Sequence, residues 1–423
     1  MRRWTNKEAK WPRTVRRVGA VLASVLALAA GASCSNDATG PDAPREVVLG
    51  GIFSLTGNWA TLGVTSKAAM ELAVEDVNAY VAGRGIHFTA DVQDTKLDPA
   101  TALAKLTALR AAGVQIVIGP QSSAELAALK PYVDANPVLL VSQSSTAGSL
   151  AVAGDGIFRF TAADSLEGVA VSALMWDDGI RAVIPVWRGD AGNQGLHTST
   201  AARFGSLGGT VSAGVEYAPT AIAFAATVAT IGTQVRAARA AHPAAQVGVY
   251  LAGFDEVASV FALAAADSVL GSVRWYGSDG VALSGALLTP QAAAFADGVG
   301  FPNPIFGLEN ANSEKWQPVA ARIKARSGVD PDAFALAVYD AVWVAAQAYL
   351  ATPEPVQAAD LKAKFVAAAG SYYGATGWTV LNAAGDRKYA DFDFFAVRHG
   401  TGAAYAWTRV AQYDTKAGTL TRP

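Results

Sequence analysis

Val114-Gln-Ile-Val-Ile118-Gly-Pro-Gln-Ser-Ser123 is the stretch that decides the fold of this chain. Residues 114–118 form a short apolar run typical of a buried strand, and residues 124–135 behind it are rich in alanine and leucine, as in a helix. A second apolar run at 138–141 leads into another polar loop, Ser142-Gln-Ser-Ser-Thr146. This alternation favours a parallel sheet with helices on both faces.

The same alternation extends in both directions. Apolar runs at 47–53 and 88–92 enclose a helical pattern that begins at Ser66. Four side chains lie on one face of that pattern: Met70, Ala73, Val77 and Tyr80. A second series of strands is predicted at 181–187, 210–217, 247–252 and 273–277. The sequence therefore predicts an α/β protein with two doubly wound, Rossmann-like lobes.

The last hundred residues depart from this pattern. Residues 315–369 are predicted to be almost wholly helical. Residues 378–381 and 391–397 are predicted to pair as a terminal hairpin across the turn signal at 383–386.

Length and composition exclude several classes of protein. The 423 residues are 52% hydrophobic and 16% charged, which is enough apolar material for more than one core. A net charge of -2 gives no electrostatic case for nucleic acid, and one cysteine excludes an intramolecular disulfide or a multi-thiolate zinc site. The four histidines have no metal-ligand spacing, and no nucleophile elbow, P-loop or full dinucleotide fingerprint is present. We expect no metal, no cofactor and no enzymatic activity.

The N-terminal sequence is typical of an export signal followed by a tether. Seven arginines and lysines among residues 1–17 precede an apolar run at 18–30 that is too short to span a bilayer. Because Gly31-Ala-Ser33 leads directly into Cys34, residues 1–33 resemble a bacterial lipoprotein signal, with Cys34 as the lipidated residue. Gly31 stands where such signals usually have leucine, so an ordinary exported protein is the alternative, and Arg16-Arg17 leaves a twin-arginine route open. Residues 34–45 are polar and are predicted to be a flexible, lipidated tether.

Three polar loops follow predicted strands and outline a candidate site. They are residues 119–123, residues 142–146 and the turn Gly277-Ser-Asp-Gly280. Ligands of open parallel sheets bind beyond the carboxyl ends of the strands. Hydroxyl and amide donors suit a carboxylate, and an aspartate suits an ammonium group, so the loops together predict a site for a zwitterion. Taken singly, each has another explanation, as a helix cap, a polar loop or a turn residue.

Longer motifs carry a family resemblance. They are Gly51-Ile-Phe-Ser-Leu-Thr-Gly57, Gly63, Glu71-Leu-Ala-Val-Glu-Asp-Val-Asn78, Asp98-Pro-Ala100, Ile118-Gly-Pro-Gln-Ser-Ser123 and Ser142-Gln-Ser-Ser-Thr146. Residues 46–400 resemble the solute-binding proteins of branched-chain amino-acid ABC transporters, the leucine/isoleucine/valine type. The resemblance implies a type I periplasmic binding protein, in which two lobes joined by three crossovers close on an amino acid. We expect residues 46–163 and 306–376 in one lobe, and residues 164–305 and 377–423 in the other.

The family's ligand-binding residues can be carried over position by position. The serine that binds the ligand carboxylate corresponds to Ser123. Ser144 corresponds to the residue whose backbone carbonyl meets the ammonium group, and Thr146 to the residue whose hydroxyl and amide meet the carboxylate. The ammonium-binding acid, a glutamate in the best-known members, corresponds to Asp279.

The walls of the expected pocket are aromatic in the family. Phe254 and Phe334 match two of these positions, although a phenylalanine can equally be a core residue. Leu62 and Gly192 stand where many members have aromatic side chains, so the pocket is expected to be wider or differently lined. Trp59 lies in the same loop as Leu62 and is a candidate to fill that space, with packing or surface exposure as the alternative.

The resemblance implies an exported solute-binding protein that delivers an amino acid to a membrane permease and its ATPases. The expected location is the periplasmic or extracytoplasmic face, with a lipid anchor at the N-terminus. Two alternatives remain open: a ligand-sensing receptor component of the same fold, and a binder of an amide, urea or an aromatic acid.

Overall fold

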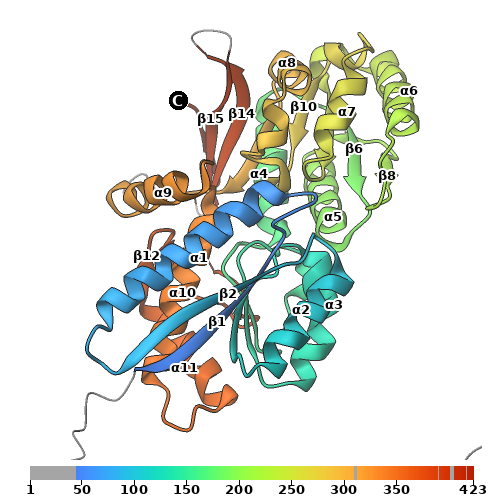
Figure 1. Ribbon diagram of the computed structural model, residues 1–423. Helices are drawn as coiled ribbons and strands as arrows, with labels where there is room; N and C mark the ends of the chain where they lie inside the picture. Colours follow the sequence, from blue (N-terminus) through green and yellow to red (C-terminus); the bar gives the residue numbers. More distant parts are fainter. Residues whose placement is uncertain (1–43, 309–311, 389, 401–403, 416) are drawn as a thin grey trace, which may run out of the picture. The chain divides into compact units, whose positions relative to one another are not determined.

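The computed structural model describes residues 44–308, 312–388, 390–400, 404–415 and 417–423 (Figure 1). The predicted signal at 1–33, the lipidation site Cys34 and all but the end of the tether lie outside the described residues, so they stay predictions. The described part is a mixed α/β structure with two parallel sheets and two smaller antiparallel sheets.

The first parallel sheet has the strand order β2-β1-β3-β4-β5. Its strands are β1 (Arg45–Phe53), β2 (Ile86–Asp94), β3 (Ile116–Ile118), β4 (Leu139–Ser142) and β5 (Ile157–Arg159). Sequence reasoning predicted the first four strands and missed β5. Ile116 and Ile118 face one apolar cluster and Val117 faces another, so both faces of the sheet are covered.

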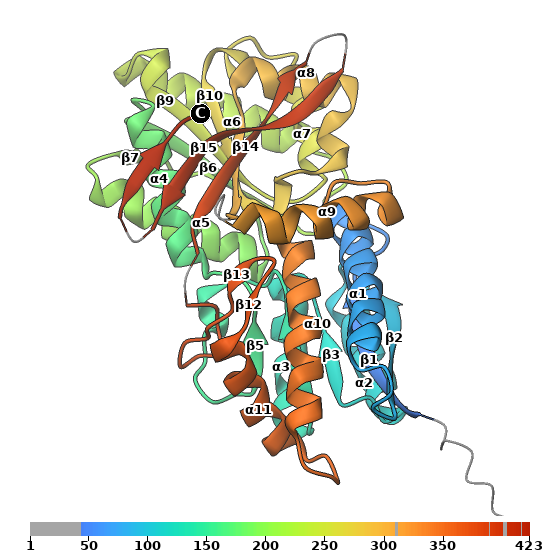
Figure 2. The ribbon, with the colours of Figure 1, turned by 90° about the vertical axis from the view of Figure 1, so that its left-hand side faces the viewer.

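Helices α1 (Ala60–Tyr80) and α10 (Ala333–Ala351) cover one face of this sheet, and α2 (Pro99–Ala111) and α3 (Ser123–Ala135) cover the other (Figure 1). Helix α10 lies between α1 and α11 (Ala358–Ser371), as Figure 2 shows. Of the four side chains predicted to share one helical face, Met70, Ala73 and Val77 are buried, whereas Tyr80, the last residue of α1, is 55% exposed.

The second parallel sheet has the order β10-β9-β6-β7, and β8 also pairs with β6. Its strands are β6 (Ala182–Arg188), β7 (Thr210–Val211), β8 (Val215–Tyr217), β9 (Val247–Ala252) and β10 (Arg274–Gly277). Its α-helices are α4 (Asp164–Asp177), α5 (Ala191–Ser206), α6 (Ala225–Ala241), α7 (Val257–Ala264) and α8 (Pro290–Val299). The predicted strand at 210–217 is thus two short strands.

Short 3-10 helices complete the loops. They are η1 (Gly148–Leu150), η2 (Ala244–Gln246), η3 (Leu270–Ser272), η4 (Asp279–Val281) and η5 (Gly285–Leu288). Residues 315–369, predicted to be almost wholly helical, contain most of α9 (Ser313–Ser327), all of α10 and most of α11.

The predicted terminal hairpin is wrong. Strand β14 (Phe392–His399) pairs with β11 (Pro302–Phe306) and β15 (Tyr405–Asp414), and β16 (Thr419–Thr421) extends this antiparallel sheet (Figure 2). The first strand of the expected hairpin does not pair with β14. Instead, β13 (Gly377–Trp378) pairs with β12 (Tyr373–Gly374). The expected turn contains Asp386, whose carboxylate is drawn into a buried ion pair with Arg159 of β5.

Helix α10 is the one described helix that is long and apolar enough to cross a membrane. However, 72% of its most apolar window is buried inside the protein, which is the pattern of a core helix. Helices α10 and α11 contact β3 and β4 of the first sheet, and β11 contacts β10 of the second. The exact lobe boundaries given above stay predictions.

Each parallel sheet has one point where its strand order reverses. In the first sheet this point lies between β1 and β3, and in the second it lies between β6 and β9. The loops after these strands diverge, and the helix N-termini that follow leave room for a ligand. These loops supply most of the residues described next.

Candidate functional site

A narrow pocket, partly open to solvent, is lined by loops and helix N-termini that follow strands of both parallel sheets. The first sheet contributes residues after β1, β3 and β4, and the second contributes residues after β6, β9 and β10. The lining residues are Trp59, Ser122, Ser123, Ser144, Thr146, Gly192, Asn193, Leu196, Phe254 and Asp279. Six of the eight predicted ligand-binding residues therefore meet at one place, although their roles in binding stay predictions.

The two serines after β3 have different tasks. Ser122 is the N-cap of α3 and forms a capping box with Glu125, so it satisfies the first amides of the helix. Ser123 is the first helical residue, and its hydroxyl leaves the helix to contact the loop after β4. The alternative explanation of this loop as a simple helix cap therefore applies to Ser122 and not to Ser123.

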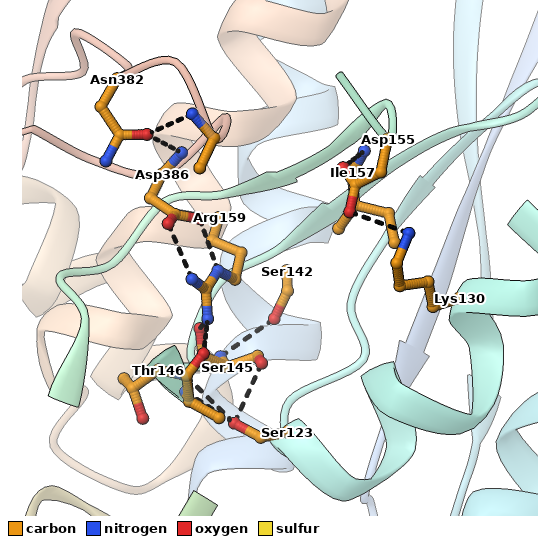
Figure 3. Close-up of polar contacts among 12 residues, drawn as sticks. Ser123, Lys130, Ser142, Ser145, Thr146, Asp155, Ile157, Arg159, Asn382 and Asp386 are labelled. Carbon is orange, nitrogen blue, oxygen red and sulfur yellow. Dashed lines mark hydrogen bonds and ion pairs between the residues drawn. The ribbon is translucent and has the colours of Figure 1, made fainter. Parts of the chain in front are cut away.

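The Ser123 hydroxyl oxygen collects hydrogen bonds from three donors (Figure 3). The Ser145 hydroxyl donates at 3.0 Å, the Thr146 amide at 3.2 Å and the Ala147 amide at 3.1 Å. A hydroxyl oxygen has only two lone pairs, so its capacity as an acceptor is used up. Ser123 lines the cavity, so its hydroxyl is within reach of a ligand there.

The loop that carries these donors is fixed from behind. Arg159 of β5 is 1% exposed, and it forms a two-point ion pair with Asp386 at 2.5 and 2.7 Å. Its third nitrogen donates to the Ala147 carbonyl at 2.7 Å and to the Ser145 carbonyl at 3.3 Å (Figure 3). The guanidinium therefore ties residues 145–147 to a segment more than two hundred residues away in the sequence.

Ser144 and Thr146 lie on the same loop. The Ser144 hydroxyl donates to the Gln121 carbonyl at 2.7 Å, so the side chain holds the two loops together. The role expected for Ser144 uses its backbone carbonyl and does not need the hydroxyl. The Thr146 carbonyl accepts from the Asp164 amide at 2.9 Å, which links this loop to the start of α4.

The start of α5 faces Ser123 from the second sheet. A Cβ atom added to Gly192 would lie 3.4 Å from the Ser123 hydroxyl oxygen, so glycine leaves space where an aromatic side chain was expected from the family. Asp190 caps α5 by accepting from the Asn193 amide at 3.0 Å, and Arg188 pairs with Asp190 at 2.7 Å. Two helix N-termini, those of α3 and α5, therefore meet at this end of the cavity, which favours an anionic group there.

Asp279 lies in the second-sheet wall and is 4% exposed. Burial raises the pKa of Asp279 to about 7, well above its usual value, because the charged form loses its hydration. The Asp279 backbone amide donates to the Glu167 carboxylate at 3.2 Å. Burial, followed by the charges of Asp279 and Asp164, also raises the pKa of Glu167 well above its usual value.

The aromatic wall consists of Trp59 and Phe254, which stack with ring centroids 4.5 Å apart. Phe334 is 1% exposed and meets the Trp59 ring edge-on at 6.2 Å, so it supports the wall from behind and does not line the cavity. Leu62 is also 1% exposed and packs in the core cluster. These two predicted pocket residues therefore lie outside the lining.

Sequence reasoning missed Gln121, which fixes the position of Trp59. Trp59 has a φ of 61°, in the left-handed region that a bulky residue rarely adopts. The Gln121 side chain donates to the Trp59 carbonyl at 3.0 Å and accepts from the Ser54 amide at 3.0 Å. Nothing in the pattern of residues 119–123 distinguishes this glutamine from an ordinary loop residue.

Two acidic residues in the first turn of α4, Asp164 and Glu167, were also missed. Acidic side chains are common at helix N-termini, so the sequence alone gives no reason to single them out. Among the described residues, no group of three or more His, Cys, Asp or Glu side chains is arranged to hold a metal ion.

The fold is that of an α/β protein with a pocket at the carboxyl edges of two parallel sheets. The comparisons give the family: the model for periplasmic binding proteins matches residues 46–403, so this chain belongs to that family. Its members bind small molecules outside the cytoplasm, and the type I periplasmic binding fold predicted from the sequence is confirmed.

Three relatives illustrate the similarity. An uncharacterized protein of Methanocaldococcus jannaschii is 28% identical, over 95% of this chain and 98% of its own length. The branched-chain amino-acid transporter substrate-binding protein LivJ of Streptococcus pneumoniae, solved with isoleucine, is 20% identical with a TM-score of 0.71, over 86% of this chain and 100% of its own. An R. palustris solute-binding protein solved with benzoate is 18% identical with a TM-score of 0.69, over 89% and 98% of the two chains.

Proposed function

We propose that this protein captures a zwitterionic amino acid between its two parallel sheets and delivers it to the permease of an ABC transporter. The observation that carries the proposal is the opposite polarity of the two cavity ends. One end offers the Ser123 hydroxyl, the Thr146 side chain and two helix N-termini, and the other offers the buried carboxyl group of Asp279. An ammonium and a carboxylate taken out of water need such partners.

The binding mechanism follows from the origin of these groups. Ser123 and Thr146 come from the first sheet, and Asp279 comes from the second. A dipolar ligand satisfies both of its ends only when the two walls face each other, so it stabilises that arrangement over a separated one. The ligand would lie beside the Trp59 and Phe254 rings, which supply an apolar surface for its side chain.

An aromatic carboxylic acid is a second candidate ligand. The stacked pair Trp59 and Phe254 favours it, as does the likeness to the fold of the benzoate complex. Such a ligand has no cation, so it would leave Asp279 buried without a partner. That cost makes the amino acid the better proposal.

The test is a thermal-shift screen of residues 34–423 against α-amino acids and aromatic acids, followed by calorimetry on Asp279→Asn. We expect an α-amino acid to bind and the variant to lose about 30-fold to several thousand-fold in affinity, from about 2 to 5 kcal/mol. The control is Asp330→Asn, an exposed acid paired with Lys324, which should leave the affinity unchanged. Amino-acid binding that survives Asp279→Asn intact would remove Asp279 from the site.

We also propose that Cys34 carries a lipid that anchors the protein outside the cytoplasm. The support is the order of the basic residues 1–17, the apolar run 18–30 and the single cysteine that follows. Cys34→Ser should move the protein from the membrane fraction to the soluble fraction and abolish incorporation of labelled fatty acid. An unchanged distribution between the two fractions would argue for a soluble exported protein.

A further inference from the structure

Three buried carboxyl groups lie behind the cavity wall, where recognition of the ammonium group of an α-amino acid needs only one. Asp164 and Glu167 lie on the first turn of α4, and Asp279 begins η4. Asp164 and Glu167 are each 2% exposed, so the groups are as inaccessible as core side chains. The Asp279 backbone amide donates to the Glu167 carboxylate at 3.2 Å, so the Glu167 carboxyl group lies against the backbone of Asp279, and each acid affects the pKa of the other.

No counter-charge neutralises this group. Among the residues that the structure describes, no lysine, arginine or histidine forms an ion pair with Asp164, Glu167 or Asp279. Arg159 is close enough to lower the pKa of Asp164, but its guanidinium is already paired with Asp386. The three acids are not arranged to hold a metal ion within the described part of the chain. Burying three ionised carboxylates without counter-ions costs a large desolvation free energy. The three acids must therefore hold protons or pair with a cation.

Asp164 is the member of the three acids whose side chain lacks hydrogen-bond partners. Neither of its two oxygens accepts a hydrogen bond of normal geometry from a described residue, although the Thr146 side chain lies close by. The hydroxyl groups of Thr200, Tyr250 and Ser278 are buried and unpartnered as well. Thr146 lines the ligand cavity, so the unsatisfied carboxylate lies directly behind the cavity wall.

The surrounding charges favour bound protons. Burial is the largest cause that raises the pKa of Asp164 to about 8, and Asp190 on α5 adds to it. Asp332, the N-cap of α10, raises the pKa of Asp279 further. Tyr250 on β9 is the other titratable neighbour, and its own pKa is raised by burial and by Glu167. Arg159 is the cation that acts on Asp164, and Asp190 is itself paired with Arg188 at 2.7 Å.

We infer that Glu167 is a second acid of the ammonium site and that it shares a proton with Asp279, which the ammonium group of the ligand displaces. Binding of the amino acid therefore releases a proton to solvent. The inference rests on the proposed function, since it takes an α-amino acid as the ligand. It assigns to Glu167 a role in setting the pH dependence of binding, with Asp279 as the direct partner of the ammonium group.

Calorimetry of the wild-type protein tests this in two buffers with different ionisation enthalpies, phosphate and Tris, from pH 6 to 8. The probe is the α-amino acid found in the screen. We expect a released fraction of up to about one proton, and an affinity that rises with pH by up to about ten-fold per unit. Glu167→Gln cannot hold the shared proton, so it should still bind but release fewer protons and show a flatter pH profile. Glu314→Gln, also in the first turn of a helix but exposed, is the control.

The outcomes separate this inference from the proposed function. Tight binding by the wild type with no proton release and the same affinity at pH 6 and 8 would overturn the inference and leave the function standing. Wild-type proton release in Glu167→Gln would also overturn it, because the proton would belong to another group. Failure of every α-amino acid to bind between pH 6 and 8 would overturn the function and the inference together. The measurement on the wild type stands even if the variant does not fold.

Discussion

Ser122 and Ser123 are adjacent, have the same side chain and do different work. Ser123→Ala removes the hydroxyl that faces the cavity, and we expect the affinity for the amino acid to fall about 10-fold to 100-fold, since a hydrogen bond to a charged group contributes about 1.5 to 3 kcal/mol. Ser122→Ala removes the cap of α3 and should lower the free energy of unfolding by about 0.5 to 2 kcal/mol. Calorimetry and urea denaturation of both variants measure the two effects.

The contrast between the two serines is the decisive readout. Loss of affinity in Ser122→Ala with none in Ser123→Ala would contradict the assignment of the carboxylate site. At this scale, sequence reasoning found Ser123 because its motif matches a known family without a gap. Gln121, Asp164 and Glu167 gave no such signal, because a loop glutamine and acids in a first helical turn are ordinary residues.

At the scale of elements, the loop at 145–147 depends on β5 and on the turn that contains Asp386. Asp386→Ala would leave Arg159 buried without its partner, and we expect a loss of about 3 to 5 kcal/mol in the free energy of unfolding. The control is Asp267→Ala, which breaks the more exposed pair with Arg236 and should cost less than about 1 kcal/mol. Chemical denaturation followed by circular dichroism gives both values, and equal losses would contradict this account.

The same contact explains why the terminal hairpin was mispredicted. Residues 383–386 have the composition of a turn, and a turn is what they form. The position of this turn is set by the buried guanidinium of Arg159, which pairs with Asp386 and holds the turn against β5. Strand β14 is then free to pair with β11 and β15. Strand β5 was missed because its three residues, Ile157-Phe-Arg159, include a charged side chain and do not lie within a longer apolar run, as those of β3 do.

For the whole molecule, the buried acids predict how stability depends on pH. Burial raises the pKa of Asp164 to about 8 and that of Asp279 and Asp332 to about 7. Between the ordinary aspartate pKa of about 4 and these raised values, the unfolded chain has lost these protons and the folded protein still holds them, so stability falls as pH rises from about 4 to about 8. Acids with lowered pKa values, such as Asp76, act in the opposite sense and only near or below pH 4.

The melting temperature of the ligand-free protein, measured by scanning calorimetry, should therefore decrease from about pH 5 to about pH 8. Asp164→Asn removes one of the titrating groups without changing the size of the side chain, so its melting temperature should fall less over the same range. A wild-type melting temperature that rises across this window would show that the buried acids are ionised and compensated in the folded protein.

The sequence by itself determined the class of fold, the strands β1 to β4, β6, β9 and β10, and the main polar positions of the site. These depend on local information: apolar runs, helical periodicity and short motifs that follow strands. Such signals give the position of a residue relative to the strand that it follows. For this reason Ser123, Ser144, Thr146 and Asp279 could be named from the sequence.

Only the tertiary structure decided which groups share a wall. It placed Gly192 opposite Ser123, put Phe334 and Leu62 behind the lining, and brought Glu167 against Asp279. These relations join segments from 69 residues apart, for Ser123 and Gly192, to 275 residues apart, for Trp59 and Phe334, and no local pattern encodes them. The physical reason is that burial, which costs a charge its hydration, depends on the packing of all the surrounding elements. A pair of neighbouring acids therefore becomes a proton-binding group only in the folded protein.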